Sequence, residues 1–175
     1  ELEGELNEWE QLRIHHLLHQ IPSEEIPSFL PLLNHRLLSV QIFATKMSAL
    51  FNQAEAEPIL LQNLSFENTP LNQCIVESLA EIGTEKSVQY LHHNFELAKP
   101  ALQVTISKTL ANIAGEDDLD FFASQLNLES YDIQLVAAKA LVGLGEKSEE
   151  YLEAASLNSE RQADIIEHAR QWVNQ

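Results

Sequence analysis

The chain has 175 residues, of which 45% are hydrophobic, and this is enough apolar material for one core of ordinary size. It carries 27 acidic and 10 basic side chains, and its formal net charge of −17 repels phosphate backbones, so we expect no nucleic-acid partner. The single cysteine, Cys74, excludes an internal disulfide and is expected to be a small buried residue. No apolar run has the length of a membrane span, so we expect no direct membrane insertion by this segment. The expected location is cytoplasmic, for the chain alone or as the soluble part of a larger or membrane-anchored protein.

Helices are predicted along the whole chain. The first covers about residues 5–20, and Pro22 follows its end because the residue before a proline avoids the helical region. A second helix, 23–33, begins at a serine cap, and Pro31 bends or shortens it. Further helices are predicted over 37–51, 58–64, 71–82, 86–95, 100–114, 118–126, 132–144, 148–155 and 160–173.

Most of the sequence repeats with a period of about 31 residues, which places Leu79, Leu110 and Leu141 in one column. A fixed period of this size is typical of stacked repeats, which bury their apolar faces against one another. The sequence therefore predicts one domain, 1–175, with about eleven helices: a leading helix and five antiparallel pairs, each with an outer helix A and an inner helix B. The predicted segments are the leading helix, 1–22, and repeats at 23–53, 54–84, 85–115, 116–146 and 147–175.

The inner helices carry a pattern shared with a known family. The stretches VAAKALVGLG at 136–145 and LNQCIVESLAEIG at 71–83 follow the order small–small–x–small–Leu–small–x–Ile–Gly. This order resembles HEAT repeats, in the compact version of about 31 residues that is common in bacterial proteins. The resemblance covers about residues 24–174 and implies an all-α, right-handed α-solenoid of the armadillo-like type. The resemblance is specific for the fold and says almost nothing about function.

Two columns of amide side chains repeat at the same spacing, and the first stands where HEAT repeats usually have arginine. These amides are Asn72, Gln103 and Gln134 in one column, and Asn63, Asn94 and Gln125 in the other. They could form a ladder for the backbone of an extended peptide, or they could satisfy carbonyls in the turns between helices. The second interpretation is favoured because buried polar groups need partners in any fold.

The inner helices present one face away from the core, and we expect this face to line the concave side of the stack. Val104 and Leu135 are apolar where solvent exposure is expected, which favours a protein contact. The candidate partner-binding residues are Gln73, Glu77, Glu81, Val104, Lys108, Asn112, Leu135 and Lys139. We therefore predict a non-catalytic scaffold, monomeric on its own, that binds a protein or peptide on this face.

Histidines are the candidate metal ligands. His15 and His19 are four residues apart on the first helix and could jointly hold zinc, but no third ligand is near in the sequence. His92 and His93 are adjacent and point to different faces. The sequence has no glycine-rich phosphate loop, nucleophile elbow or Cys/His cluster, so we expect no metal, no cofactor and no enzyme activity.

Two alternatives remain open. In the first, the chain, which begins with Glu1, is a regulatory or assembly domain of a larger protein, membrane-anchored or not, and Leu6 and Trp9 make its contact. In the second, it is a lyase-type or metal-dependent enzyme on a HEAT scaffold, which would hold a small molecule or a metal in a pocket.

Overall fold

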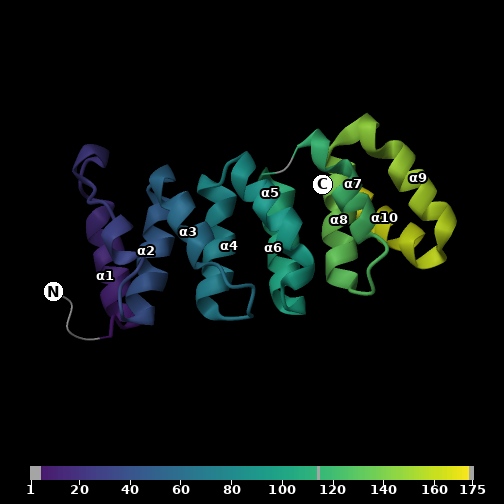
Figure 1. Cartoon of the computed structure of the whole chain (residues 1–175). Coiled ribbons are helices and arrows are strands. Elements are labelled where there is room, and N and C mark those ends of the chain that lie inside the picture. Colours follow the sequence, from purple (N-terminus) through teal and green to yellow (C-terminus); the bar gives the residue numbers. More distant parts are fainter. Residues whose placement is uncertain (1–4, 114, 174–175) are drawn as a thin grey trace.

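The computed structural model describes residues 5–113 and 115–173, and in this part of the chain all regular structure is helical (Figure 1). The all-α prediction is confirmed. The α-helices are α1 (Glu8–Leu18), α2 (Leu38–Leu50), α3 (Glu57–Asn63), α4 (Pro70–Ile82), α5 (Glu85–Asn94), α6 (Pro100–Ile113), α7 (Leu119–Gln125), α8 (Tyr131–Gly143), α9 (Glu149–Asn158) and α10 (Glu160–Val173). Short 3-10 turns lie at Ser23–Glu25, Leu30–Leu32, Ala54–Ala56, Phe95–Leu97, Glu116–Asp118 and Gly145–Ser148.

The helix predicted over 23–33 is wrong, because this segment forms only two separate 3-10 turns. Pro27 and Pro31 lack the N–H groups that a continuous helix needs at those positions. The side chain of Gln53 serves the backbone instead: its Oε1 accepts from the N–H of Phe29 at 2.9 Å, and its Nε2 donates to the carbonyl of Pro27 at 2.9 Å. The described residues therefore hold ten α-helices, one fewer than expected.

The other predicted helices agree with the structure to within three residues at either end. The predicted end of the 100–114 helix is at Ala114, which lies outside the described residues. Boundaries of this accuracy follow from capping: Thr69 accepts from the N–H of Asn72, and Ser130 accepts from that of Ile133. At the far end of α8, Gly145 has a φ of +72°, a backbone conformation that favours glycine and stops a helix.

The B helices α2, α4, α6, α8 and α10 pack in that order, each against the next, while α3, α5, α7 and α9 pack beside them (Figure 1). Side-chain hydrogen bonds link successive B helices at similar offsets. Ser78 Oγ on α4 donates to the carbonyl of Thr45 on α2 at 3.4 Å, and Thr109 Oγ1 on α6 donates to that of Val76 on α4 at 3.0 Å. Cys74 Sγ on α4 also donates to the carbonyl of Ile42 on α2, 32 residues earlier, so α2 and α4 run parallel and nearly in register. The bond between α6 and α4 spans the same 33 residues as that of Ser78.

The core lies between these helices and follows the repeat. Leu79, Leu110 and Leu141 are each 0% exposed, which confirms the column assigned from the sequence. The small residues beside them are also fully buried; these are Val76, Ser107 and Ala138. Small side chains let parallel helices approach closely, and close approach buries the large leucines completely.

The first helix, α1, lies parallel to α2 at the N-terminal end of the row. The N–H of Leu6 donates to Ser39 Oγ at 3.1 Å, and the ring of His19 lies 5.7 Å from that of Phe51. These pairs are 33 and 32 residues apart, the same offset that relates α2 to α4. Leu6 is 5% exposed and belongs to the core, which corrects the expectation that it forms a contact surface with Trp9.

A buried carboxylate links the N-terminal ends of α3 and α5. Glu57 accepts hydrogen bonds from the N–H of Thr84 at 2.8 Å, from the hydroxyl of Thr84 at 2.8 Å and from the hydroxyl of Ser87 at 2.6 Å. Burial raises the pKa of Glu57, but the hydrogen bonds from Ser87 and Thr84 together outweigh burial, and the pKa is lowered below its ordinary value of 4.5. The bonds hold the outer helices of two successive repeats together.

Candidate protein-binding face

Among the described residues, grooves lie between successive B helices, and we call the surface that carries them the B-helix face; two of these grooves contain candidate residues. The first groove, between α2 and α4, has a volume of about 400 Å³ and is lined by Lys46, Ala49, Leu50, Cys74, Glu77, Ser78 and Glu81. The second groove, among α6, α8 and α10, has a volume of about 440 Å³ and is lined by Lys108, Ala111, Asn112, Val136, Lys139, Ala140 and Trp172. Both grooves are open to solvent, so they fit segments of a partner better than an enclosed small molecule.

Five of the eight candidate residues line these grooves. Glu77 and Glu81 line the first; Lys108, Asn112 and Lys139 line the second. The helical repeat explains this grouping, since Glu77, Lys108 and Lys139 stand 31 residues apart and parallel helices turn such positions to the same side.

The other three candidates lie outside the grooves. Gln73 is half-buried, and its Nε2 donates to Asn68 Oδ1 at 2.8 Å, so its amide is bonded within its own repeat. Val104 and Leu135 are also half-buried and pack against the core. They do not form the exposed apolar strip that the sequence suggested, because side chains of the adjacent helices cover part of each.

Trp172 is the groove residue that sequence reasoning missed. Trp172 stands 28 residues after Leu144, and continuing the repeat at this shortened spacing places it inward. In the structure Trp172 is 58% exposed, and the ammonium of Lys139 lies 3.8 Å from the centroid of its ring. A cation over an aromatic face at this distance is attractive and orders both side chains. The shortened spacing of the last repeat was the signal that the alignment no longer held there.

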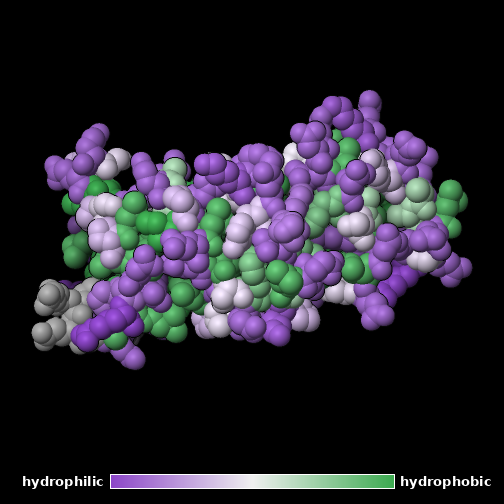
Figure 2. All heavy atoms as spheres, viewed as in Figure 1, coloured by the Kyte–Doolittle hydropathy of each residue, from purple (hydrophilic) through white to green (hydrophobic). Residues whose placement is uncertain are grey.

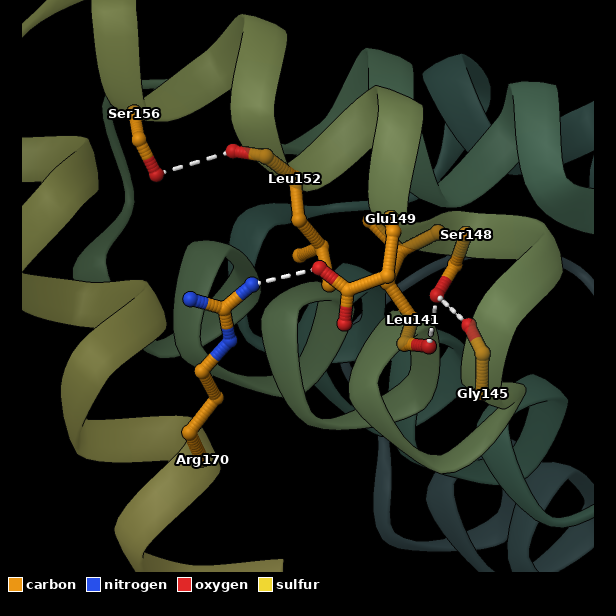
Figure 3. A network of polar contacts seen from close by, with 7 residues as sticks. All are labelled: Leu141, Gly145, Ser148, Glu149, Leu152, Ser156 and Arg170. Carbon is orange, nitrogen blue, oxygen red and sulfur yellow. Dashed lines mark hydrogen bonds and ion pairs between the residues drawn. The ribbon is translucent and has the colours of Figure 1, made fainter.

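Figure 3 shows the bonds that join the start of α9 to α8 and to α10. The guanidinium of Arg170, two residues before Trp172, bonds Glu149 Oε2 on α9 at 2.6 Å. Ser148 Oγ, just before α9, donates to the carbonyl of Gly145 at 2.7 Å and also to that of Leu141 in α8. These bonds tie the start of α9 to α8 on one side and to α10 on the other.

The two grooves differ in charge. The first contains one lysine and two glutamates, whereas the second contains two lysines and no carboxylate. Within the described residues, no carboxylate lies within ion-pair distance of Lys108 or Lys139, although Lys99, Lys147 and Arg170 each have one. The second groove is therefore a locally cationic site on an acidic protein.

The first amide column bonds to turns, as the structural interpretation predicts. Gln103 Nε2 donates to the carbonyl of Phe95 at 3.2 Å, and Gln134 Nε2 donates to that of Leu126 at 2.8 Å. Each bond spans the turn between the outer and inner helix of one repeat, and Asn72 likewise bonds the carbonyl of Glu67, at 2.7 Å. The amide N–H groups of these side chains are bonded to turns within the fold, which argues against their use as a ladder for a peptide.

The second amide column has no common role. Asn63 Nδ2 donates to Asn34 Oδ1 at 2.8 Å, whereas Asn94 Nδ2 donates to the carbonyl of Tyr90, also at 2.8 Å. Gln125 is 1% exposed, and neither its amide nitrogen nor its amide oxygen has a hydrogen-bond partner among the described residues. Because Gln125 is buried, it contributes nothing to a binding surface. Its amide, buried without partners, costs stability.

Cys74 borders the first groove but is itself 4% exposed, and its Sγ donates to the carbonyl of Ile42 at 3.7 Å. Burial raises the pKa of the Cys74 thiol to about 11, so the thiol is protonated at neutral pH. The expectation of a small buried residue is confirmed.

The histidines lie at two separate places. The Nε2 atoms of His15, on α1, and of His19, just after its end, are 3.1 Å apart, within hydrogen-bond distance. His92 stacks on Phe121 with ring centroids 3.9 Å apart, and burial lowers its pKa although Asp118 acts in the opposite direction. In residues 5–113 and 115–173, no group of three or more His, Cys, Asp and Glu side chains is placed to hold a metal ion.

In comparisons with known proteins, no protein-family model matches the chain, and no curated protein is detectably similar to it. Among the helices that the structure describes, none combines the length and the apolar composition needed to cross a membrane.

Proposed function

We propose that this chain is a right-handed α-solenoid of HEAT-like pairs that acts as a non-catalytic scaffold and binds a partner protein or peptide on its B-helix face. The observation that supports this most is the pair of open grooves between successive B helices, lined by five of the residues selected from the sequence. Stacked B helices provide a semi-rigid surface, so binding requires little reorganisation of the scaffold. Recognition then depends on shape and on the charges in the grooves.

The ordered connections favour a scaffold of fixed shape. Hydrogen bonds at an offset of about 32 residues join α2, α4 and α6, and Glu57 joins α3 to α5. A stack of repeats presents an extended surface, along its whole length, that a partner can bind. We expect it to work in the cytoplasm, as a monomer, without metal or cofactor.

The proposal is tested by exchanging charges on the B-helix face while the net charge stays the same. The variant Glu77→Lys with Lys108→Glu alters both grooves, and Lys86→Glu with Glu96→Lys makes the same exchange on the outer side, at α5 and the turn after it. Proteins captured from a cell extract are compared by quantitative mass spectrometry. We expect a partner captured by the wild-type chain and by the outer-side variant to be lost from the groove variant; equal capture by all three contradicts the proposal.

A second candidate is a regulatory or assembly domain of a larger protein that makes its contact through α1. Trp9, Leu12 and Leu17 on α1 are 78%, 58% and 55% exposed and line a shallow groove with Arg13 and His16. Figure 2 shows apolar residues among the hydrophilic ones at this end of the molecule. The variant Trp9→Ser with Leu12→Ser separates the candidates: loss of the partner with this variant, and not with the groove variant, favours the contact through α1.

A further inference from the structure

The groove among α6, α8 and α10 has the charge opposite to that of the protein as a whole. The chain has 27 acidic and only 10 basic side chains, yet two lysines and no carboxylate line this groove. Carboxylates are plentiful in the same half of the molecule, where Glu116 forms an ion pair with Lys147 and Glu149 forms one with Arg170. Lys108 and Lys139 are without such a partner within the described residues, so their charges are available to a ligand.

Lys139 is positioned as well as unpaired. Its side chain is only partly exposed, and its ammonium lies 3.8 Å from the centre of the Trp172 ring. An ammonium ordered in this way loses less side-chain entropy when it meets a carboxylate than a free surface lysine does. Arg170, two residues before Trp172 on α10, forms an ion pair with Glu149 on α9.

The uncharged residues that line the groove indicate what else a ligand needs besides negative charge. Ala111, Val136, Ala140 and the ring of Trp172 supply apolar surface, and Asn112 is an exposed amide able to bond a peptide backbone. We propose that this groove binds an extended acidic segment of a partner protein, with two carboxylates on Lys108 and Lys139 and an apolar side chain of the segment against Trp172. This inference rests on the proposed function and specifies its partner.

The geometry of packed helices gives the spacing of the two carboxylates. Neighbouring helices lie about 8–10 Å apart, and an extended chain advances about 3.3 Å per residue. Because Lys108 and Lys139 occupy equivalent positions on adjacent B helices, two carboxylates about three positions apart match them. These carboxylates face the same way when the segment takes the extended polyproline II conformation, which has about three residues per turn. A segment that crosses all five B helices needs about 12 residues.

The net charge of −17 repels an acidic segment at long range but does not prevent contact in the groove. Salt screens charges separated by more than about 8–10 Å, whereas ion pairs in contact are screened less. Added salt therefore removes the repulsion before it weakens the pairs. We expect the association rate of the segment to rise between low and moderate salt, opposite to the behaviour of a ligand attracted by net charge.

The test is a selection from a library of random peptides, about 12 residues long, against the full chain. Enriched peptides are then measured by fluorescence anisotropy against the wild type, the variant Lys108→Glu with Lys139→Glu, and a matched control, Arg36→Glu with Lys86→Glu. The control makes the same change of net charge at two exposed cations outside both grooves. Thermal melting confirms that each variant is folded.

We expect enriched peptides to contain two acidic residues about three positions apart, beside an apolar residue. The groove variant weakens their binding by about 10-fold or more and the control by less than about 2-fold. Trp172→Ala also weakens binding without lowering the melting temperature appreciably, because Trp172 is largely exposed.

A further variant, Glu77→Lys with Glu81→Lys in the first groove, separates failure of this inference from failure of the proposed function. Peptides without acidic residues that lose binding in this variant, and not in the Lys108/Lys139 variant, overturn the acidic-segment inference and leave the B-helix face as the binding surface. No enrichment, or enriched peptides that are insensitive to both variants, overturns both proposals.

Discussion

Replacing Leu110 by alanine tests the stacking on which the face depends. Leu110 lies on α6, in the middle of the row of B helices, and is 0% exposed. The change removes three buried carbon atoms, which costs about 2.4 kcal/mol at about 0.8 kcal/mol for each. The cavity left behind relaxes only in part and brings the loss to about 3–4 kcal/mol. For a chain of this length, each kcal/mol lowers the melting temperature by about 2–4 °C, so we expect a fall of about 10 °C.

Leu157 provides the matched control, because it is a helical leucine on α9 that is 89% exposed. Leu157→Ala makes the same chemical change and should cost less than about 0.5 kcal/mol. Urea unfolding of both variants, followed by circular dichroism, gives the free energies of unfolding, and an unchanged slope shows that the unfolding process is the same. If Leu110→Ala costs no more than Leu157→Ala, the column assignment and the buried interface between B helices are refuted.

Three further predictions concern buried polar groups. Glu57→Gln should destabilise the chain by about 2 kcal/mol at pH 7. Because the pKa of Glu57 is lowered in the folded state, the wild type should lose this stability as the pH falls through that folded pKa, below 4.5. Acid unfolding curves should show less of this loss for the variant. The Cys74 thiol, buried and with its pKa raised to about 11, should react with a thiol reagent far more slowly in the native chain than in urea, and equal rates would contradict its burial. Gln125→Met should raise the melting temperature, because it replaces a buried amide without hydrogen-bond partners by an apolar side chain of similar volume; a fall would indicate that the amide has a partner.

Much of the fold could be predicted because each repeat carries the same apolar pattern, so equivalent positions support one another. One leucine at a helical position says little, but Leu79, Leu110 and Leu141 at equal spacing require a buried column, and all three are fully buried. The 23–33 segment could not be predicted in the same way. It stands at the start of the repeats, and its backbone bonds to the side chain of Gln53, more than 20 residues away in the sequence.

The candidate site was predicted in part for the same reason. Glu77, Lys108 and Lys139 were found from their columns, since equivalent positions on parallel helices face the same way. Val104 and Leu135 are less exposed than their columns suggested, because the extent of cover depends on the side chains of neighbouring helices. Trp172 was missed because the last repeat is shorter, so its column placed it inward while the packing of α10 turns it toward Lys139.

By itself the sequence determined that this chain is helical, that its helices repeat about every 31 residues, and which leucines are buried. These properties depend on local periodicity and on the spacing of apolar residues, and both can be read directly from the sequence. Only the tertiary structure decided that α1 lies parallel to α2, that Leu6 is buried in the core, and that two lysines and a tryptophan share one groove. Such contacts depend on the distances between helices, and those are fixed by packing against residues far away in the sequence.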